Sequence, residues 1–297
     1  MTAPKDTRRG ILAMCGAMAL FLVNDSIVKL VSERLAMDQI VLLRGGFGSL
    51  LVLAFLVLAQ PWTLRFLLHA GMVRVGGRAA LDAASSFTYL WALFHMPLPN
   101  VSAINLSSPL LVTILAVLLL GERVAWRRWS AIIAGLAGVL MVVQPSTAAF
   151  NLFSLVALAG TLMGALRDVM TRRIALEIPS VLVTFATAVA ITAIAGVSVL
   201  IRGWHSVTAA DLALLATASL FLIGAYQLII VAMRIAETST VAPFRYTAIL
   251  WALILGYALW GDVPNALALA GIAVLVASGL YLMHRERVVA RRRRAQD

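Results

Sequence analysis

The sequence predicts an all-α integral membrane protein with ten transmembrane helices in two inverted five-helix repeats and both termini in the cytoplasm. Three observations lead to this prediction. Hydrophobic residues make up 62% of the chain and charged residues only 12%, which is too apolar for a water-soluble domain. Ten apolar runs reach the roughly 20 residues that a helix needs to cross the hydrocarbon core. A short motif also occurs twice, once in each half of the chain.

The ten expected spans are separated by short polar connections. The first span is unlike a signal peptide, because it continues through Asn24, Asp25 and Lys29 without a small-residue cleavage site. In chain order the spans are 11–31, 39–59, 72–94, 99–120, 128–145, 152–173, 180–201, 210–233, 239–260 and 265–283. The single cysteine, Cys15, lies in the first span, so no intramolecular disulfide is possible.

The distribution of basic residues sets the expected orientation. With a cytoplasmic N-terminus, the outer connections hold only Lys29, Arg34 and Arg202, against 18 basic residues in the inner segments. This asymmetry follows the positive-inside rule and places both termini inside. The net charge of +11 comes from these short segments and from the tail Arg291 to Arg294, not from one basic face. Nucleic acid is therefore not an expected partner.

The repeated motif divides the chain into two halves. Val101-Ser102-Ala103 leads through an apolar run to Gly121-Glu122, and Val241-Ala242-Pro243 leads through another to Gly261-Asp262. Aligning the two copies gives a first repeat at 1–146, a second at 147–284 and a basic cytoplasmic tail at 285–297. Each repeat holds five spans, and an odd number forces the repeats into opposite orientations. This is the inverted construction found in carriers that work by alternating access.

The first helices of the two repeats also correspond. Asp25 and Lys29 align with Asp168 and Arg172, and each pair places an acid and a base four residues apart on one helix face.

Six charged residues fall well inside expected spans, and Lys29 lies near the outer end of the first span. Charge in hydrocarbon is costly, so these side chains are expected to face the protein interior. Asp25, Lys29 and Arg44 form an outer group. The inner group consists of Asp82, Arg167, Asp168 and Arg245. Each group has at least as many bases as acids, which favours ionised, paired carboxylates and argues against a proton-carrying aspartate. Structural ion pairs between helices are the alternative interpretation.

Several segments together resemble the drug/metabolite transporter superfamily, and specifically its EamA-type members. The segments are Arg44, Tyr89-Leu90-Trp91-Ala92-Leu93, Val101-Ser102-Ala103-Ile104, Ser108-Pro109-Leu110, Leu120-Gly121-Glu122-Arg123, Gly135 and Gly138. The second half departs from the pattern, with Asp262 for the usual glutamate and Phe244-Arg245-Tyr246 at the start of its fourth span. The resemblance implies a multi-pass carrier in a bacterial inner membrane. Within the family, it is most similar to aromatic amino-acid exporters of the YddG type.

For such a substrate, aromatic residues would line the pocket, a guanidinium would meet the carboxylate, and polar groups would hold the ammonium. Arg245, and after it Arg167, are the expected carboxylate partners. The expected substrate-binding residues are Asn24, Ser85, Tyr89, Trp91, Asn105, Arg167, Tyr226, Gln227, Arg245, Tyr246 and Trp251. Packing of the aromatic residues is the alternative interpretation.

Pro109 lies midway along the fourth span. It removes a backbone hydrogen bond and clashes with the carbonyl of Asn105, so a helix bend is expected between these residues. Its alternative role is a static packing kink.

The expected function is secondary transport: export of small metabolites, with aromatic amino acids favoured, by alternating access through a central cavity. The alternatives are a cationic or nucleoside-like metabolite, or a membrane receptor or scaffold that transports nothing. An enzyme is not expected, since Ser107-Ser108, His95 and Asp82 belong to no known catalytic motif. No cofactor or metal is expected. The expected partners are the substrate and the lipid bilayer, and the sequence is compatible with a monomer without setting the oligomeric state.

Overall fold

The computed structural model describes residues 7–59, 72–121, 126–144, 151–171, 180–236 and 241–294. Within these ranges all regular structure is helical. The elements are α1 (Thr7–Val31), α2 (Met37–Ala59), α3 (Met72–His95), α4 (Leu98–Asn105), α5 (Ser108–Leu120), α6 (Trp126–Val143), α7 (Leu152–Thr171), α8 (Ser180–Arg202), α9 (Ala209–Ile235), the 3-10 helix η2 (Ala242–Tyr246), α11 (Thr247–Trp260) and α12 (Ala266–Arg294).

The helices have the composition of a membrane protein. Seven stretches of the described chain are long and apolar enough to cross a bilayer: Arg8–Val31, Met37–Leu58, Leu98–Leu120, Leu152–Thr171, Val181–Arg202, Ala209–Met233 and Ala242–Trp260. Shorter apolar helices occupy Trp129–Val143 and Ala266–Leu282. The expectation of an all-α integral membrane protein is thereby confirmed.

Each half of the chain contains a helix interrupted at the corresponding place. In the first half α4 ends at Asn105 and α5 begins at Ser108, so Pro109 stands in the first turn of α5, where a missing N–H is tolerated. In the second half η2 contains Pro243 and is followed directly by α11. Both of the following helices end on a glycine with φ 68°, Gly121 and Gly261, which is the left-handed conformation that closes a helix.

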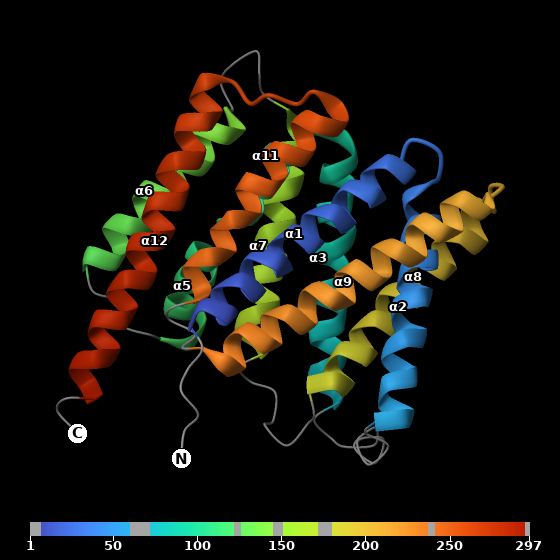
Figure 1. The fold of residues 1–297 in the computed structure, drawn as a ribbon, viewed down its shortest axis with the longest axis horizontal. Helices are drawn as coiled ribbons and strands as arrows, with labels where there is room; N and C mark the ends of the chain where they lie inside the picture. The colour runs from blue at the N-terminus through green and yellow to red at the C-terminus, as the bar shows by residue number, and fades with distance from the viewer. Residues whose placement is uncertain are drawn as a thin grey trace.

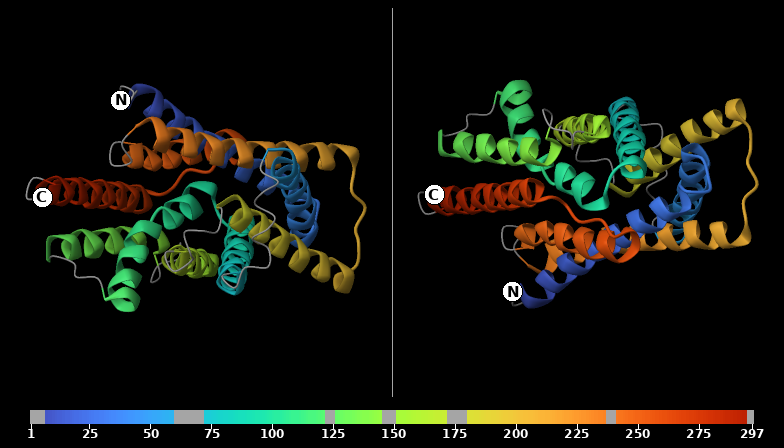
Figure 2. Two further views of the ribbon diagram at one scale, coloured as in Figure 1. Left: turned by 90° about the horizontal axis from the view of Figure 1, so that it is seen from below. Right: turned by 90° about the horizontal axis from the view of Figure 1, so that it is seen from above.

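The helices form two layers closed by a helix pair at either side. α1 packs on α9, and α3 packs on α7. Figure 2 shows α1, α9 and α11 in one layer and α3, α5 and α7 in the other. α2 pairs with α8 on one side, and α6 pairs with α12 on the other (Figure 1).

Glycines bring α6 and α12 into backbone contact. A Cβ on Gly138 would lie 2.7 Å from the carbonyl oxygen of Gly271, and a Cβ on Gly271 would lie 2.6 Å from the carbonyl oxygen of Gly138. Small residues that allow two backbones to touch are typical of helix interfaces in membranes.

The two ends of the bundle are distinguished by the chain termini. α1 begins and α12 ends at the same end, which we call the near end (Figure 1). The opposite, far end holds the α1–α2 turn and the end of α3. Lys29 of α1 contacts Met96 after α3 and Asp262 after α11, and Arg34 of the α1–α2 turn contacts Asp211 in the first turn of α9.

α12 continues to Arg294, so most of the expected basic tail extends the last helix. Alanine, glutamate and arginine are good helix formers, which explains this extension.

Candidate functional site

A polar cluster joins the first three helices deep within the bundle. The α1–α3 cluster consists of Asn24 and Asp25 on α1, Arg44 on α2 and Tyr89 on α3. The Tyr89 hydroxyl donates to Asp25 Oδ2 at 2.7 Å, and Asn24 Nδ2 donates to Asp25 Oδ1 at 2.9 Å. Arg44 Nη1 donates to Asn24 Oδ1 at 3.4 Å. Asp25 is therefore held by neutral donors, and Arg44 reaches it through Asn24 instead of pairing with it directly.

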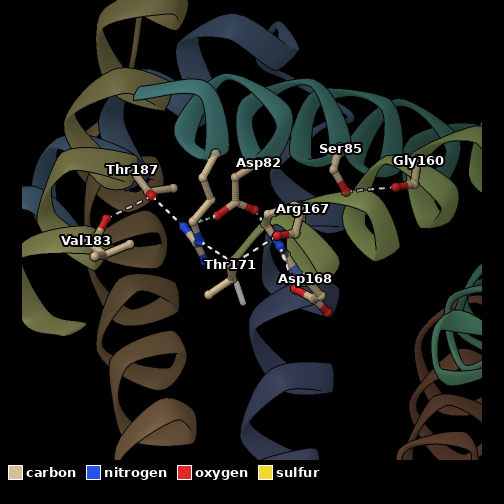
Figure 3. Close-up of polar contacts among 9 residues, drawn as sticks. Asp82, Ser85, Gly160, Arg167, Asp168, Thr171, Val183 and Thr187 are labelled. Atoms are coloured by element: carbon tan, nitrogen blue, oxygen red, sulfur yellow. Dashed lines mark hydrogen bonds and ion pairs between the residues drawn. The ribbon is translucent and has the colours of Figure 1, made fainter. Parts of the chain in front are cut away.

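A second polar cluster ties α3 to α7 and α8. Asp82 on α3 accepts from two guanidinium groups: Arg167 on α7, and Arg78 one turn earlier on α3, at 3.5 Å. Arg167 is also bound to Asp168 through two of its nitrogens, at 2.9 and 2.8 Å (Figure 3). Every guanidinium in this cluster thus meets a carboxylate, as expected for charges inside a membrane protein.

Two threonines complete this second cluster, and one serine lies beside it. Arg78 donates from Nε to Thr171 Oγ1 at 2.9 Å and from Nη1 to Thr187 Oγ1 at 2.8 Å, which brings in α8. One turn along α3, the Ser85 hydroxyl donates to the carbonyl oxygen of Gly160 at 2.8 Å (Figure 3). We call the set Arg78, Asp82, Arg167, Asp168, Thr171 and Thr187 the α3–α7–α8 cluster.

Tyr226 on α9 lies near charged residues of both clusters. It is close enough to interact electrostatically with Arg44 of one cluster and with Asp82 and Arg167 of the other. Its ring meets Phe21 edge-on, with centroids 5.1 Å apart, and 53% of the residue is exposed. Charged residues of both clusters thus lie within electrostatic range of this one half-exposed tyrosine.

The far end of the bundle contains an open pocket of about 470 Å³. It lies where the α1–α2 turn meets the last turns of α3 and α8. Its lining includes Glu33, Met37, Trp91, Phe94, His95 and Arg202. Trp91, which the sequence placed with Tyr89 in one pocket, lies here, 52% exposed.

Lys29 does not pair with Asp25, the acid four residues earlier on the same helix. Instead, Lys29 Nζ lies 3.7 Å from Asp262 Oδ2 and donates to the carbonyl oxygen of Met96 at 2.8 Å. It also lies 4.7 Å from the ring centre of Trp260. Asp262 belongs to the second copy of the repeated motif, and this repetition is the sequence feature that singles out Asp262. Its counterpart Glu122 lies outside the described residues.

The remaining expected substrate residues are not gathered at the α1–α3 cluster. Arg245 is exposed and makes no hydrogen bond or ion pair with any described residue. Tyr246 is buried, and its hydroxyl packs against Gly279 of α12 without a hydrogen-bond partner among the described atoms. Trp251 packs on the hydrophobic core. Asn105 and Gln227 are exposed.

The structure thus brings together Asn24, Tyr89, Arg167 and Tyr226 of the expected substrate residues, with Asp25 and Arg44 beside them. Ser85 lies one turn from Asp82, on the contact between α3 and α7. Sequence reasoning did not select Arg78, Thr171 and Thr187, because it counted the first as a loop charge and gave no reason to single out the threonines.

Comparison with known proteins gives a consistent picture. Residues 8–144 match the EamA-like transporter family. The chain is 26% identical over 272 residues to an S-adenosylmethionine uptake transporter of Rickettsia bellii, covering 89% of both chains. It is 28% identical over 285 residues to the pseudopaline exporter CntI of Pseudomonas aeruginosa, covering 93% of this chain and 96% of that one.

Two further similarities extend these findings. A riboflavin transporter of Rhizobium johnstonii is 27% identical over 210 residues, or 70% of this chain and 69% of that one. A solved crystal structure with 19% identity superposes with a TM-score of 0.64 over 95% of this chain and 98% of that chain. At this identity the superposition shows the fold alone.

Proposed function

We propose that this protein is a multi-pass membrane carrier of the EamA-like transporter family, which residues 8–144 match, and that it moves an amino-acid-like substrate with a flat ring across a bacterial inner membrane. Aromatic amino acids are the first candidates. The observation that carries the proposal is the α1–α3 cluster with Tyr226 beside it, where one guanidinium, one carboxylate and two tyrosines lie near one another.

Arg44 is the proposed partner of the substrate carboxylate. Its only hydrogen bond to a described side chain is the long one to Asn24, at 3.4 Å, so most of its five donors remain available. Arg167, by contrast, already meets both Asp82 and Asp168. A guanidinium recognises a carboxylate through two parallel hydrogen bonds, and the bond is stronger where water is excluded.

Asp25 is the proposed partner of the substrate ammonium. Its two oxygens each accept one hydrogen bond, from Asn24 and from Tyr89, and a carboxylate accepts about four. The neutral donors hold the carboxylate in place without neutralising its charge. An ammonium group that loses water on entry would recover its interactions there.

The ring of the substrate would lie against the aromatic side chains beside the same cluster. Tyr226 and Phe21 form an edge-on pair that presents a fixed aromatic surface beside Arg44. Such a surface accepts a flat ring through offset or edge-on contact.

A second substrate class is supported by the relatives. Those from Rickettsia are described as S-adenosylmethionine uptake transporters, and S-adenosylmethionine joins an amino-acid head group to a cationic sulfonium and a nucleoside. The same carboxylate and ammonium partners would serve it, with the nucleoside ring on Tyr226. This matches the cationic or nucleoside-like alternative that the sequence left open.

We further propose alternating access by two inverted repeats of five spans. The packing pattern supports this relation: the first helix of one half packs on the third helix of the other in both directions, α1 on α9 and α7 on α3. Corresponding helices also pair with each other, α2 with α8 and α6 with α12. A twofold axis in the membrane plane produces this pattern, and the positive-inside rule then places the near end in the cytoplasm.

The test is counterflow in proteoliposomes containing the purified protein. A radiolabelled panel would hold aromatic, aliphatic and cationic amino acids and S-adenosylmethionine. Saturable movement of tryptophan or S-adenosylmethionine is expected, and Arg44→Gln should reduce it by about tenfold or more, since a charged hydrogen bond contributes about 1.5–3 kcal/mol. Arg34→Gln removes an arginine that is paired with Asp211 at the far end and serves as the matched control.

Two results would contradict the proposal. Absence of saturable movement for every panel member would favour the receptor or scaffold alternative. Loss of transport in Arg245→Gln with full transport in Arg44→Gln would move the carboxylate site to η2, where sequence reasoning placed it.

A further inference from the structure

One of the three basic residues expected on the outer face has no partner among the residues that the structure describes. Lys29 is held by Asp262 at 3.7 Å, and Arg34 is held by Asp211 at 2.8 Å. Arg202, the last residue of α8, makes no ion pair or hydrogen bond with any described residue, and it lines the far-end pocket. A guanidinium left free in a pocket is available to an anionic group.

The same pocket contains a carboxylate with a free oxygen. Glu33 in the α1–α2 turn accepts one long hydrogen bond on Oε1, from Trp260 Nε1 at 3.4 Å. No described residue donates to its Oε2. The pocket therefore offers one negative and one positive group, contributed by elements far apart in the sequence.

Aromatic side chains from the end of α3 form another wall. Trp91, Phe94 and His95 all line the pocket. Phe153 of α7 supports two of them: it stacks on His95 with centroids 4.2 Å apart, and its ring centre is 6.5 Å from that of Trp91. The rings are thus held in position before a ligand arrives, which lowers the entropic cost of binding.

The pocket is distinct from the α1–α3 cluster although one helix serves both. Residues two apart on a helix point about 200° away from each other. Tyr89 points to Asp25 on α1, and Trp91 lines the far-end pocket. The end of α3 therefore separates an interior polar site from a site at the outer face.

We propose that the far-end pocket is a second substrate site, which binds a zwitterionic metabolite with a flat ring at the outer face of the carrier. Arg202 receives its carboxylate, Glu33 receives its ammonium, and Trp91 and His95 contact its ring. This inference rests on the proposed function. The volume of about 470 Å³ lies within the range of small-molecule sites. Such a site would bind substrate that enters from outside, or retain it after export.

The test compares the two sides of the membrane. Proteoliposomes with the full chain in one known orientation would be supplied with radiolabelled tryptophan from either side. Arg202→Gln is expected to raise the outer half-saturation concentration by about tenfold, a loss of about 1.4 kcal/mol. The inner half-saturation concentration and the maximal rate should stay as in the wild type. Glu33→Gln should behave similarly, and Arg202→Lys should restore part of the affinity because it keeps the charge.

Arg34→Gln is the matched control, since it removes one positive charge from the same face outside the pocket. Equal outer half-saturation concentrations for Arg202→Gln and the wild type would overturn the inference while leaving the proposed function intact. An equal change on both sides would assign Arg202 a structural role and also overturn it. A wild type that moves no panel member would overturn both proposals.

A lipid head group shares the chemistry of this ligand and requires its own measurement. If the effect of Arg202→Gln disappears when phosphatidylcholine replaces phosphatidylethanolamine in the liposomes, the pocket binds lipid and the inference is wrong. An effect that persists in both lipids supports substrate binding.

Discussion

Lys29 Nζ lies 3.7 Å from Asp262 Oδ2, which joins the last turn of α1 to the residue pair that closes α11. The two side chains are only 12% and 20% exposed. Asp262 also accepts a long hydrogen bond from the backbone N–H of Leu98, at 3.4 Å, at the start of α4. A single carboxylate thus connects three elements at the far end.

Asp262→Asn is expected to destabilise the far end by about 1–3 kcal/mol, because it leaves a mostly buried ammonium without its charged partner. Lys29 keeps its bond to the Met96 carbonyl, which limits the loss. The thermal unfolding midpoint of the detergent-purified protein measures the effect. Asp262→Glu is the control, since it keeps the negative charge and matches Glu122 of the first motif copy. Its unfolding midpoint should lie closer to that of the wild type. An unchanged midpoint in Asp262→Asn would show that the pair contributes little.

Tyr89→Phe tests the hydrogen bond that fixes Asp25. The substitution removes the donor at 2.7 Å and leaves the ring in place. We expect the half-saturation concentration for the transported substrate to rise by about tenfold or more, since a bond to a charged group contributes about 1.5–3 kcal/mol. Counterflow kinetics in proteoliposomes measure it. Wild-type kinetics in Tyr89→Phe would exclude a positioning role for this hydroxyl.

Gly138→Ala tests the close approach of α6 and α12. The added methyl group would press on the Gly271 carbonyl and on the backbone of Leu275, neither of which is a flexible side chain. A lower thermal midpoint is therefore expected, with a loss of about 1–3 kcal/mol as in other overpacked interfaces.

Gly46→Ala is the matched control for that substitution. A methyl group at Gly46 on α2 would meet nothing within 4 Å. Alanine in a helix interior is favoured over glycine by about 0.5–1 kcal/mol, so this variant should be as stable as the wild type or more so. Equal midpoints for the two variants would contradict the proposed dependence on backbone contact.

The interior charges predict the energetic coupling of transport. Asp82 and Asp168 are both ion-paired to Arg167, and Asp25 accepts hydrogen bonds from Asn24 and Tyr89, so each of these carboxylates is held by partners within the protein. Counterflow should therefore proceed without any proton or sodium gradient. A strict dependence of net movement on a proton gradient would reject this picture.

The positions of the helices were largely predictable from the sequence. The thickness of the bilayer fixes the length of an apolar run, so a span expected at 72–94 appears as α3, Met72–His95. The break before Pro109 was predictable because proline disrupts a local hydrogen bond.

The partners of the charged residues were not predictable in the same way. Lys29 and Asp262 are 233 positions apart, and no local spacing rule connects them. Arg245 was expected in the pocket on the assumption of an α-helix. The chain there forms the 3-10 helix η2, which has about 3.0 residues per turn, and Tyr246 is buried while Arg245 is exposed.

Corresponding helices of the two halves pair with each other, α2 with α8 and α6 with α12. This pairing has a consequence for the free energies of the inward-facing and outward-facing forms. Under the proposed twofold relation, exchanging the conformations of the halves turns the carrier to face the other side. That exchange maps α2–α8 and α6–α12 onto themselves, while α1–α9 and α3–α7 trade places. Inward- and outward-facing forms would then share the same set of interfaces and differ in free energy only where the two halves differ in sequence. Residues such as Lys29 and Asp262, and not the overall architecture, would set which side the empty carrier prefers.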